Sequence, residues 1–155
     1  RIIQGADIGF GNLEMSLNET PELQKGTYNF RRGEEFGWEI LKLGINLVGL
    51  ANNHAFDYGA PGLLDSMRIL RQSGIAFAGA GKNLGAAQAP VYRQVDRTRF
   101  ALLSFMSGDR GSAKIDRLPK ALGPNSAFPW IHPMIFCSAS MFAAMSIIFL
   151  LRVWI

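Results

Sequence analysis

Cysteine, histidine and, over one long stretch, charge are scarce in this chain of 155 residues. Cys137 is the single cysteine, which excludes an internal disulfide and a zinc site built on several cysteines. Histidine occurs only as His54 and His132, and no charged residue lies between positions 121 and 151. Apolar sequence is abundant: 48% of the residues are hydrophobic and 18% are charged, which suffices for a core and is too apolar for a disordered chain.

Clustered positive charge is also missing, although the formal net charge is +4. Lys and Arg are scattered, the only basic pair is Arg31-Arg32, and aromatic residues do not alternate with them. The basic residues therefore indicate a solvated surface, and we expect no nucleic-acid partner. The length fits one α/β domain.

The chain alternates short apolar runs with segments of helical periodicity. Residues 7–13, 45–50 and 75–79 are typical of short strands, and residues 34–43 and 61–73 are typical of helices. Strands that alternate with helices predict an α/β fold with a mostly parallel sheet covered on both faces.

The second predicted helix has a signal at each end. Pro61 suits its first turn and Gly74 its carboxyl end. Its predicted apolar face comprises Leu63, Leu64, Met67 and Leu70. Residues 28–30 predict a short extended piece before the helices, and residues 91–95 and 99–105 predict two later strands joined by a polar turn.

The strongest candidate site is the segment ANNHAFDYG, residues 51–59. It places two amides, an imidazole and a carboxylate just after a buried strand, and parallel sheets carry their sites in such loops. Amide oxygens and imidazole nitrogens bind metals, and an imidazole can also protonate a leaving group. The alternative interpretation is a loop whose Asn residues cap a helix and whose His is incidental.

A second candidate site is the segment DIGFGNLE, residues 7–14, in which a carboxylate also follows a strand. Two such strand ends side by side could hold a divalent ion. In the alternative interpretation Glu14 is an exposed acid and Asn12 is a turn residue.

Taken together, GNLE, ANNHAFDYG and GIAFAGAGKN resemble the poly-γ-glutamate capsule-synthesis (CapA-like) family, which has the calcineurin-like metallophosphoesterase fold. The resemblance covers roughly residues 5–110, and the ANNH-x-x-DYG element is its most specific part. It implies an α/β/β/α sandwich around a centre of two divalent metal ions, which would be Mn, Fe, Zn or Mg.

The resemblance also implies roles for individual residues. Glu14, Asn53 and His54 would bind metal, and His54 would also contact the transferring group or protonate the leaving group. Asp57 would orient the imidazole ring of His54 or, alternatively, cap the helix that begins near Pro61. Asn12 and Asn52 would hold these residues in place without binding the metal themselves.

The chain departs from the family pattern in two places. The family begins with a strand that ends in Gly-Asp and carries a Gly-His-x-His-like element near its end, and we expect this chain to lack that first strand and the C-terminal half of the domain. A centre with two metal ions takes about six protein ligands. We therefore expect the fragment to be weakly active or inactive.

By resemblance, the parent protein works in the cell envelope, in synthesis of a poly-γ-glutamate capsule or a similar polymer. Its substrate would be an anionic polymer or a phosphoester, and its partners would include capsule-synthesis membrane proteins. A hydrolase with a metal-activated water is the first hypothesis. A scaffold or binding module without catalysis, or an inactive fragment, is the alternative.

Composition divides the chain near residue 121, and we predict a capsule-synthesis domain over residues 1–120 and an apolar tail over residues 121–155. Residues 134–151 are just long enough for a membrane anchor. The tail could instead be a buried helix or sequence outside the family's reading frame, as after a frame break.

Two other enzyme classes receive little support. Residues 79–85 have the glycine spacing of a dinucleotide-binding turn, but Pro90 leaves too little room for the helix that should follow. No serine lies in a Gly-x-Ser-x-Gly context, so a serine hydrolase is not indicated.

Overall fold

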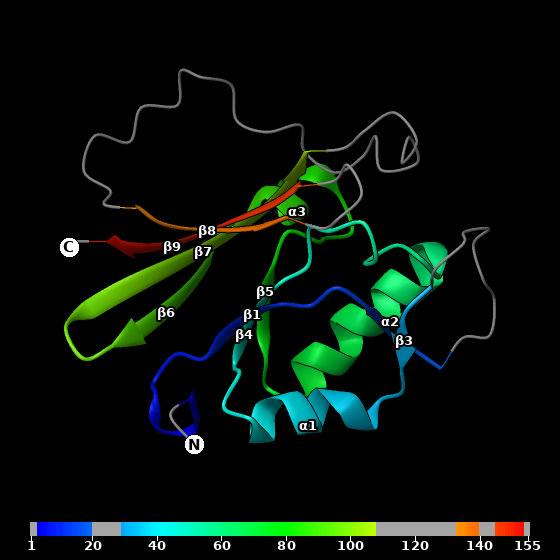
Figure 1. Cartoon of the computed structure of the whole chain (residues 1–155), viewed down its shortest axis with the longest axis horizontal. Helices are drawn as coiled ribbons and strands as arrows, with labels where there is room; N and C mark the ends of the chain where they lie inside the picture. Colours follow the sequence, from blue (N-terminus) through cyan, green and yellow to red (C-terminus); the bar gives the residue numbers. More distant parts are fainter. Residues whose placement is uncertain (1–2, 20–28, 108–132, 140–144, 154–155) are drawn as a thin grey trace.

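The computed structural model describes residues 3–19, 29–107, 133–139 and 145–153, the last two ranges as backbone strands (Figure 1). Helical elements are η1 (Ile3–Gly5), α1 (Glu35–Lys42), α2 (Gly59–Gln72) and α3 (Leu84–Gln88). Strands are β1 (Phe10–Asn12), β2 (Ser16–Leu17), β3 (Arg31–Arg32), β4 (Leu47–Gly49), β5 (Ala76–Ala78), β6 (Val91–Val95), β7 (Thr98–Ser107), β8 (Pro133–Ala139) and β9 (Met145–Val153).

A parallel sheet with strand order β1-β4-β5 forms the middle layer of the molecule. Its central strand is buried on both faces, because Leu47 and Val48 point to opposite sides and are 0% and 2% exposed. Val48 belongs to the core on the helical side, whereas Leu47 packs with Ala78 and Leu102 on the other side. Because successive side chains of β4 point to opposite faces, this strand contributes to a hydrophobic core on each side of the sheet.

Helices α1 and α2 cover one face of this sheet (Figure 1). Residues from both helices enter the same core as β4; they include Ile40, Leu63, Met67, Ile69 and Leu70. Leu64 was predicted to lie on this apolar face, but its side chain is 45% exposed. Ile69, fully buried, takes part in the core, because the helix presents positions 63, 66, 67, 69 and 70 to the sheet.

Both main helices end as the sequence predicts. Gly44 follows α1 with φ +91° and Gly74 follows α2 with φ +77°, the left-handed conformation that glycine adopts without a steric penalty. Helix α2 begins at Gly59, two residues before Pro61, so Pro61 lies within its first turn. Each glycine ends a helix and turns the chain into the next parallel strand.

The other face of the parallel sheet is covered by an antiparallel sheet with strand order β6-β7-β9-β8. Strands β6 and β7 form a hairpin, as predicted, with Asp96 at φ +50° in the turn. Figure 1 shows the resulting layers: helices, parallel sheet, antiparallel sheet. This confirms the predicted α/β class, and the three layers correspond to an α/β/β part of the expected sandwich.

Local structure differs from expectation in two places. The short extended piece expected at residues 28–30 is β3, Arg31–Arg32, because its backbone pairs with β2 at Ser16 and Leu17. Of the three alternatives for the tail, the buried helix does not apply to its described residues, which form β8 and β9, and β9 pairs with β7 along its whole length. Tertiary strand pairing decided both, and neighbouring residues alone do not encode it.

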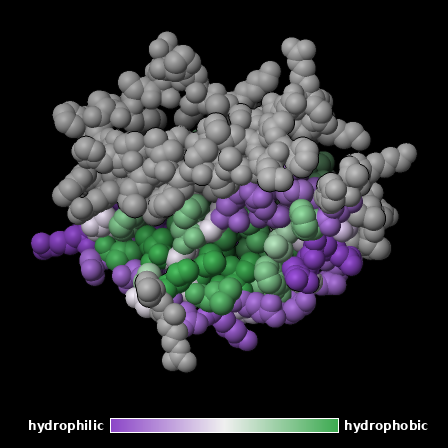
Figure 2. All heavy atoms as spheres, in the orientation of Figure 1, coloured by the Kyte–Doolittle hydropathy of each residue, from purple (hydrophilic) through white to green (hydrophobic). Residues whose placement is uncertain are grey.

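Among the residues that the structure describes, no helix is long and apolar enough to cross a membrane. The predicted division at residue 121 falls within residues 108–132, outside the described ranges, as do His132 and Phe142. Figure 2 shows an apolar area bordered by hydrophilic residues on the face in view. Large apolar side chains that are exposed are Ile3, Phe30, Trp38, Leu43, Leu64 and Tyr92.

Candidate functional site

The two candidate segments meet at the carboxyl edge of the parallel sheet. Strand β1 runs into Leu13 and Glu14, and β4 runs into the loop that holds Asn52 to Asp57. The strands are adjacent, with Asn12 opposite Gly49, and the amide of Leu13 donates to the carbonyl of Gly49 at 3.1 Å. Parallel pairing therefore places the two polar segments side by side, as expected for an α/β site.

The side chain of Asn52 makes four hydrogen bonds, two to the first segment and two within its own loop. Its side chain is fully buried, and its Nδ2 donates to the carbonyl of Leu13 at 2.8 Å and to Oδ1 of Asn12 at 3.1 Å. Its Oδ1 accepts from the amides of His54 at 3.1 Å and Ala55 at 2.9 Å. Every hydrogen-bonding position of the amide is used towards protein groups, so Asn52 shapes the loop.

Glu14 is connected to the same network through Asn12. The Nδ2 of Asn12 donates to Oε1 of Glu14 at 2.7 Å, while its Oδ1 accepts from Asn52. The carboxylate is thereby held beside the end of β1 and directed by an amide that is itself fixed from β4. Asn12 therefore links the carboxylate of Glu14 to the buried side chain of Asn52.

His54 and Asp57 form the second half of the site. The Nδ1 of His54 lies 3.0 Å from Oδ2 of Asp57, and the side chains are only 16% and 10% exposed. The same Oδ2 accepts a hydrogen bond from the backbone amide of Phe30 at 3.1 Å. Helix α2 has Tyr58 as its N-cap residue and no side-chain cap, so Asp57 contacts the imidazole rather than the helix.

Asn53 differs from its neighbour Asn52 because its Oδ1 is buried and has no hydrogen-bond partner among the described residues. Buried polar atoms without a partner are uncommon and call for an explanation such as an ion or a ligand. An amide oxygen of this kind, next to an imidazole, fits a divalent metal ion.

The remaining donor set fits less well. In the ranges that the structure describes, no group of three or more His, Cys, Asp or Glu side chains could hold a metal ion. The available ligand types are the carboxylate of Glu14, the amide of Asn53 and the imidazole of His54. They suit part of one metal position, and two ions need about six protein ligands.

Sequence reasoning missed two contributors, Phe30 and Ser104. The ring of Phe30 contacts the ring of His54 edge to face, with centroids 4.7 Å apart and an interplanar angle of 77°. The hydroxyl of Ser104, on β7, accepts from the amide of Ala51 at 3.1 Å and so ties the antiparallel sheet to the site loop. Neither residue is close in sequence to the segments that it supports, so no local pattern could have indicated it.

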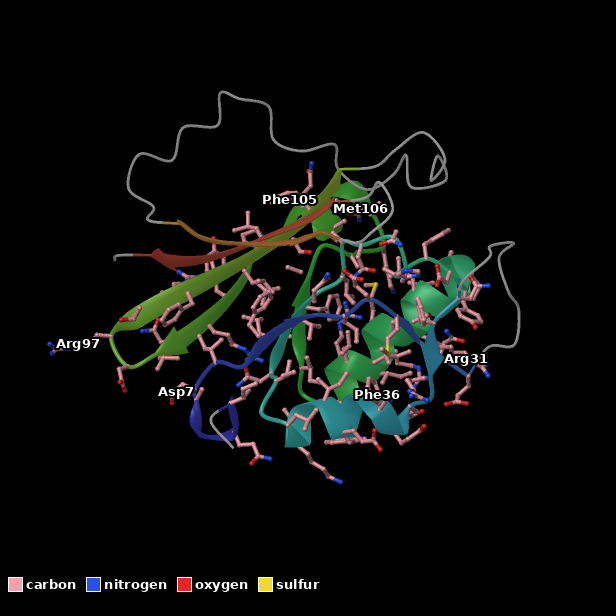
Figure 3. All side chains as sticks on the ribbon, in the orientation of Figure 1. Asp7, Arg31, Phe36, Arg97, Phe105 and Met106 are labelled. Atoms are coloured by element: carbon pink, nitrogen blue, oxygen red, sulfur yellow. The ribbon has the colours of Figure 1, made fainter. Side chains whose placement is uncertain are left out.

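The basic pair that follows Phe30 is also near the site. Figure 3 shows Arg31 on β3 beside α2, at the opposite side of the view from Asp7. The guanidinium of Arg31 lies 5.7 Å from the ring centroid of Tyr58, and that of Arg32 lies 5.8 Å from Phe36. Both arginines pack on aromatic rings as well as facing solvent.

Comparison with known proteins identifies the family. Residues 1–129 match the family model described as "Bacterial capsule synthesis protein PGA_cap". The chain is 37% identical over 109 residues to uncharacterized protein y4sH of Sinorhizobium fredii, covering 66% of this chain and 24% of that protein.

Two relatives have a named role. The chain is 31% identical over 107 residues to capsule biosynthesis protein CapA of Bacillus anthracis, covering 66% of this chain and 26% of that protein. It is 32% identical over 80 residues to PGA biosynthesis protein CapA of Bacillus subtilis, covering 49% and 21%. The chain thus spans about a quarter of the length of these relatives. Because the family match covers most of the chain, including both halves of the site, the chain belongs to the bacterial capsule synthesis family PGA_cap.

Proposed function

We propose that this chain supplies the Asn-His half of a metal-dependent hydrolase site in a cell-envelope protein of capsule biosynthesis. The observation that carries the proposal is the buried, unpartnered Oδ1 of Asn53, adjacent in sequence to the hydrogen-bonded His54–Asp57 pair. Family membership supports the biological process, since two relatives are named for capsule or PGA biosynthesis.

Each residue has a distinct task in this proposal. Asn53 and Glu14 would hold a divalent ion, which would be Mn, Fe, Zn or Mg, since amide and carboxylate ligands do not select among them. The ion would polarise the bond under attack and make water an effective nucleophile near neutral pH. His54 would present Nε2 to the ion or to the leaving group, and Asp57, which contacts Nδ1, would hold the ring in that orientation.

The proposed substrate is an anionic polymer or a phosphoester, cleaved at a phosphoester or a γ-glutamyl link. The hydrogen bonds of Asn52 support such a role, because they tie the loop to Leu13 and hold the backbone amides of the two residues that follow Asn53. Positioning of this kind accounts for a large part of the rate that such sites achieve. Capsule-synthesis membrane proteins are the proposed partners.

A scaffold or binding module without catalysis is the second candidate function. It is favoured by one observation: the described residues contain no group of three or more acidic, histidine or cysteine ligands. In that case Asn12, Asn52 and Asp57 would serve only to stabilise the edge of the sheet.

Metal content of the purified chain distinguishes the two functions. We expect the wild type to bind Mn, Fe or Zn and to hydrolyse a chromogenic phosphodiester weakly. Asn53→Ala and His54→Ala should each weaken metal binding by roughly 100-fold or more, because each removes a ligand.

Asn46→Ala is the matched control. Asn46 precedes β4 at the opposite edge of the sheet, and its Oδ1 is also buried without a partner. We expect this variant to retain the metal and the activity. A folded wild type without metal, or equal losses in all three variants, would favour the scaffold function instead.

A further inference from the structure

Phe30 is unusual among the exposed aromatic residues because it contacts the proposed site twice. Its side chain is 49% exposed, so the protein covers only part of the ring. Its ring lies against the ring of His54, and its backbone amide donates to Oδ2 of Asp57. Both partners of the His54–Asp57 pair are therefore held by one residue that precedes them by more than twenty positions.

The backbone at Phe30 is itself fixed to the sheet. The carbonyl of Phe30 accepts from the amide of Ser16 at 3.0 Å, and β3 continues from there in parallel pairing with β2. Ser16 is 1% exposed and leads into Leu17, which is fully buried in the main core. The contact with His54 thus starts from an anchored strand rather than from a free loop.

The hydrogen bonds at Asp57 determine which imidazole nitrogen carries a proton. Oδ2 accepts from the amide of Phe30, which can only donate, and the same oxygen lies 3.0 Å from Nδ1 of His54. A carboxylate oxygen can only accept, so Nδ1 is the donor in the tautomer that completes this hydrogen bond. The other nitrogen, Nε2, then has its lone pair available on the side away from Asp57.

We infer that Phe30 is a positioning residue that holds His54 in the Nδ1–H tautomer and aims Nε2 into the site. The amide of Phe30 donates to Oδ2 of Asp57 and so holds the carboxylate beside Nδ1 of His54. The ring of Phe30 limits rotation of the imidazole about its Cβ–Cγ bond. Edge-to-face packing of two rings at this distance is a favourable geometry that a rotated ring would lose.

The inference goes beyond the proposed function in assigning a role to Phe30, and it rests on that function only for the consequence in catalysis. The orientation of His54 can be observed in the metal-free chain, with no turnover at all. The chain has two histidines, so a His132→Gln background leaves His54 as the only imidazole.

The test is the nitrogen-15 spectrum of the imidazole in wild type, Phe30→Ala, Phe30→Tyr and Tyr92→Ala, each in the His132→Gln background. We expect the wild type to show a single Nδ1–H tautomer with a resolved Nδ1 proton. Phe30→Ala keeps the backbone amide but removes the ring, so the imidazole can rotate away from Asp57, and the resolved proton should give way to a tautomer mixture. Phe30→Tyr, which keeps the ring, should restore the wild-type spectrum. Tyr92 is 47% exposed on β6, so Tyr92→Ala controls for loss of an exposed ring and should change nothing.

Kinetics provide a second readout if the wild type is active. Phe30→Ala should lower kcat by roughly tenfold with little change in KM, because misaligned catalytic groups affect the chemical step. An Nε2–H tautomer in the wild type, or an unchanged spectrum and kcat in Phe30→Ala, would overturn the inference. Wild type without metal or turnover but with the expected spectra would refute the proposed function alone.

Discussion

The two edges of the parallel sheet contain similar polar residues and use them differently. At the amino edge, Asn46 donates from Nδ2 to the carbonyl of Asp7, and Arg93 reaches the carbonyls of Asn46 and Gly74. At the carboxyl edge, side chains also bind one another, from Glu14 through Asn12 to Asn52, in addition to backbone groups. The first arrangement closes the ends of strands, whereas the second fixes functional groups in space.

This difference follows from the direction of parallel strands. All three strands leave the sheet at the carboxyl edge, so loops that are distant in sequence meet there and their side chains can form a network. At the amino edge, β4 and β5 are each entered through a helix end and a glycine, which leaves mainly backbone groups to be satisfied. Substitutions made in pairs, one at each edge, measure how much more unfolding free energy is lost at the carboxyl edge than at the amino edge.

The largest effect on stability should come from Asn52→Ala. The substitution leaves two amides and a carbonyl without their side-chain partner in a fully buried position, which should cost roughly 4 kcal/mol of unfolding free energy. Asn46→Ala at the amino edge removes one exposed hydrogen bond and should cost about 1 kcal/mol. Urea denaturation of both variants measures the two values, and equal values would remove the contrast between the edges.

A smaller effect is expected at the glycines that flank β5. Gly79 follows the strand with φ +89°, and a Cβ there would lie 2.8 Å from the backbone nitrogen and the Cβ of Ala51. Gly79→Ala should therefore cost about 3 kcal/mol, from the left-handed backbone and the overlap together. Gly74 precedes the strand with φ +77° and open space around it, so Gly74→Ala should cost only about 1 kcal/mol. Thermal unfolding of the pair tests this, and a Gly74 variant that is the less stable one would contradict it.

The smallest effect concerns the links between the two sheets. Ser104→Ala removes the acceptor of the buried amide of Ala51 and should cost about 1.5 kcal/mol. Arg93→Ala removes two long hydrogen bonds of 3.4 and 3.5 Å at the amino edge and should cost less than about 0.5 kcal/mol. Chemical denaturation of both variants under identical conditions measures the difference in unfolding free energy. A larger loss in Arg93→Ala would show that the amino edge carries the sheet contact.

Local sequence signals predicted the order of strands and helices from α1 to β5, the β6–β7 hairpin and the residues of both polar segments, but not α3. They succeeded at α1, α2 and the β6–β7 hairpin because helix periodicity, the glycines Gly44 and Gly74, and a polar turn are properties of neighbouring residues. They failed at β3, and they did not predict β8 (Pro133–Ala139) or β9 (Met145–Val153), because pairing with distant strands decides these conformations.

The sequence by itself determined that an Asn-His-Asp segment follows a buried strand, and that the chain resembles capsule-synthesis proteins. Only the tertiary structure decided that the side chain of Asn52 spends all its hydrogen bonds on other protein groups, whereas the Oδ1 of Asn53 has no partner among the described residues. It also decided that Phe30 reaches His54 and Asp57. The physical reason is that a hydrogen bond or a ring contact depends on distance in space, which parallel pairing of β1 with β4 and of β2 with β3 sets independently of separation along the chain.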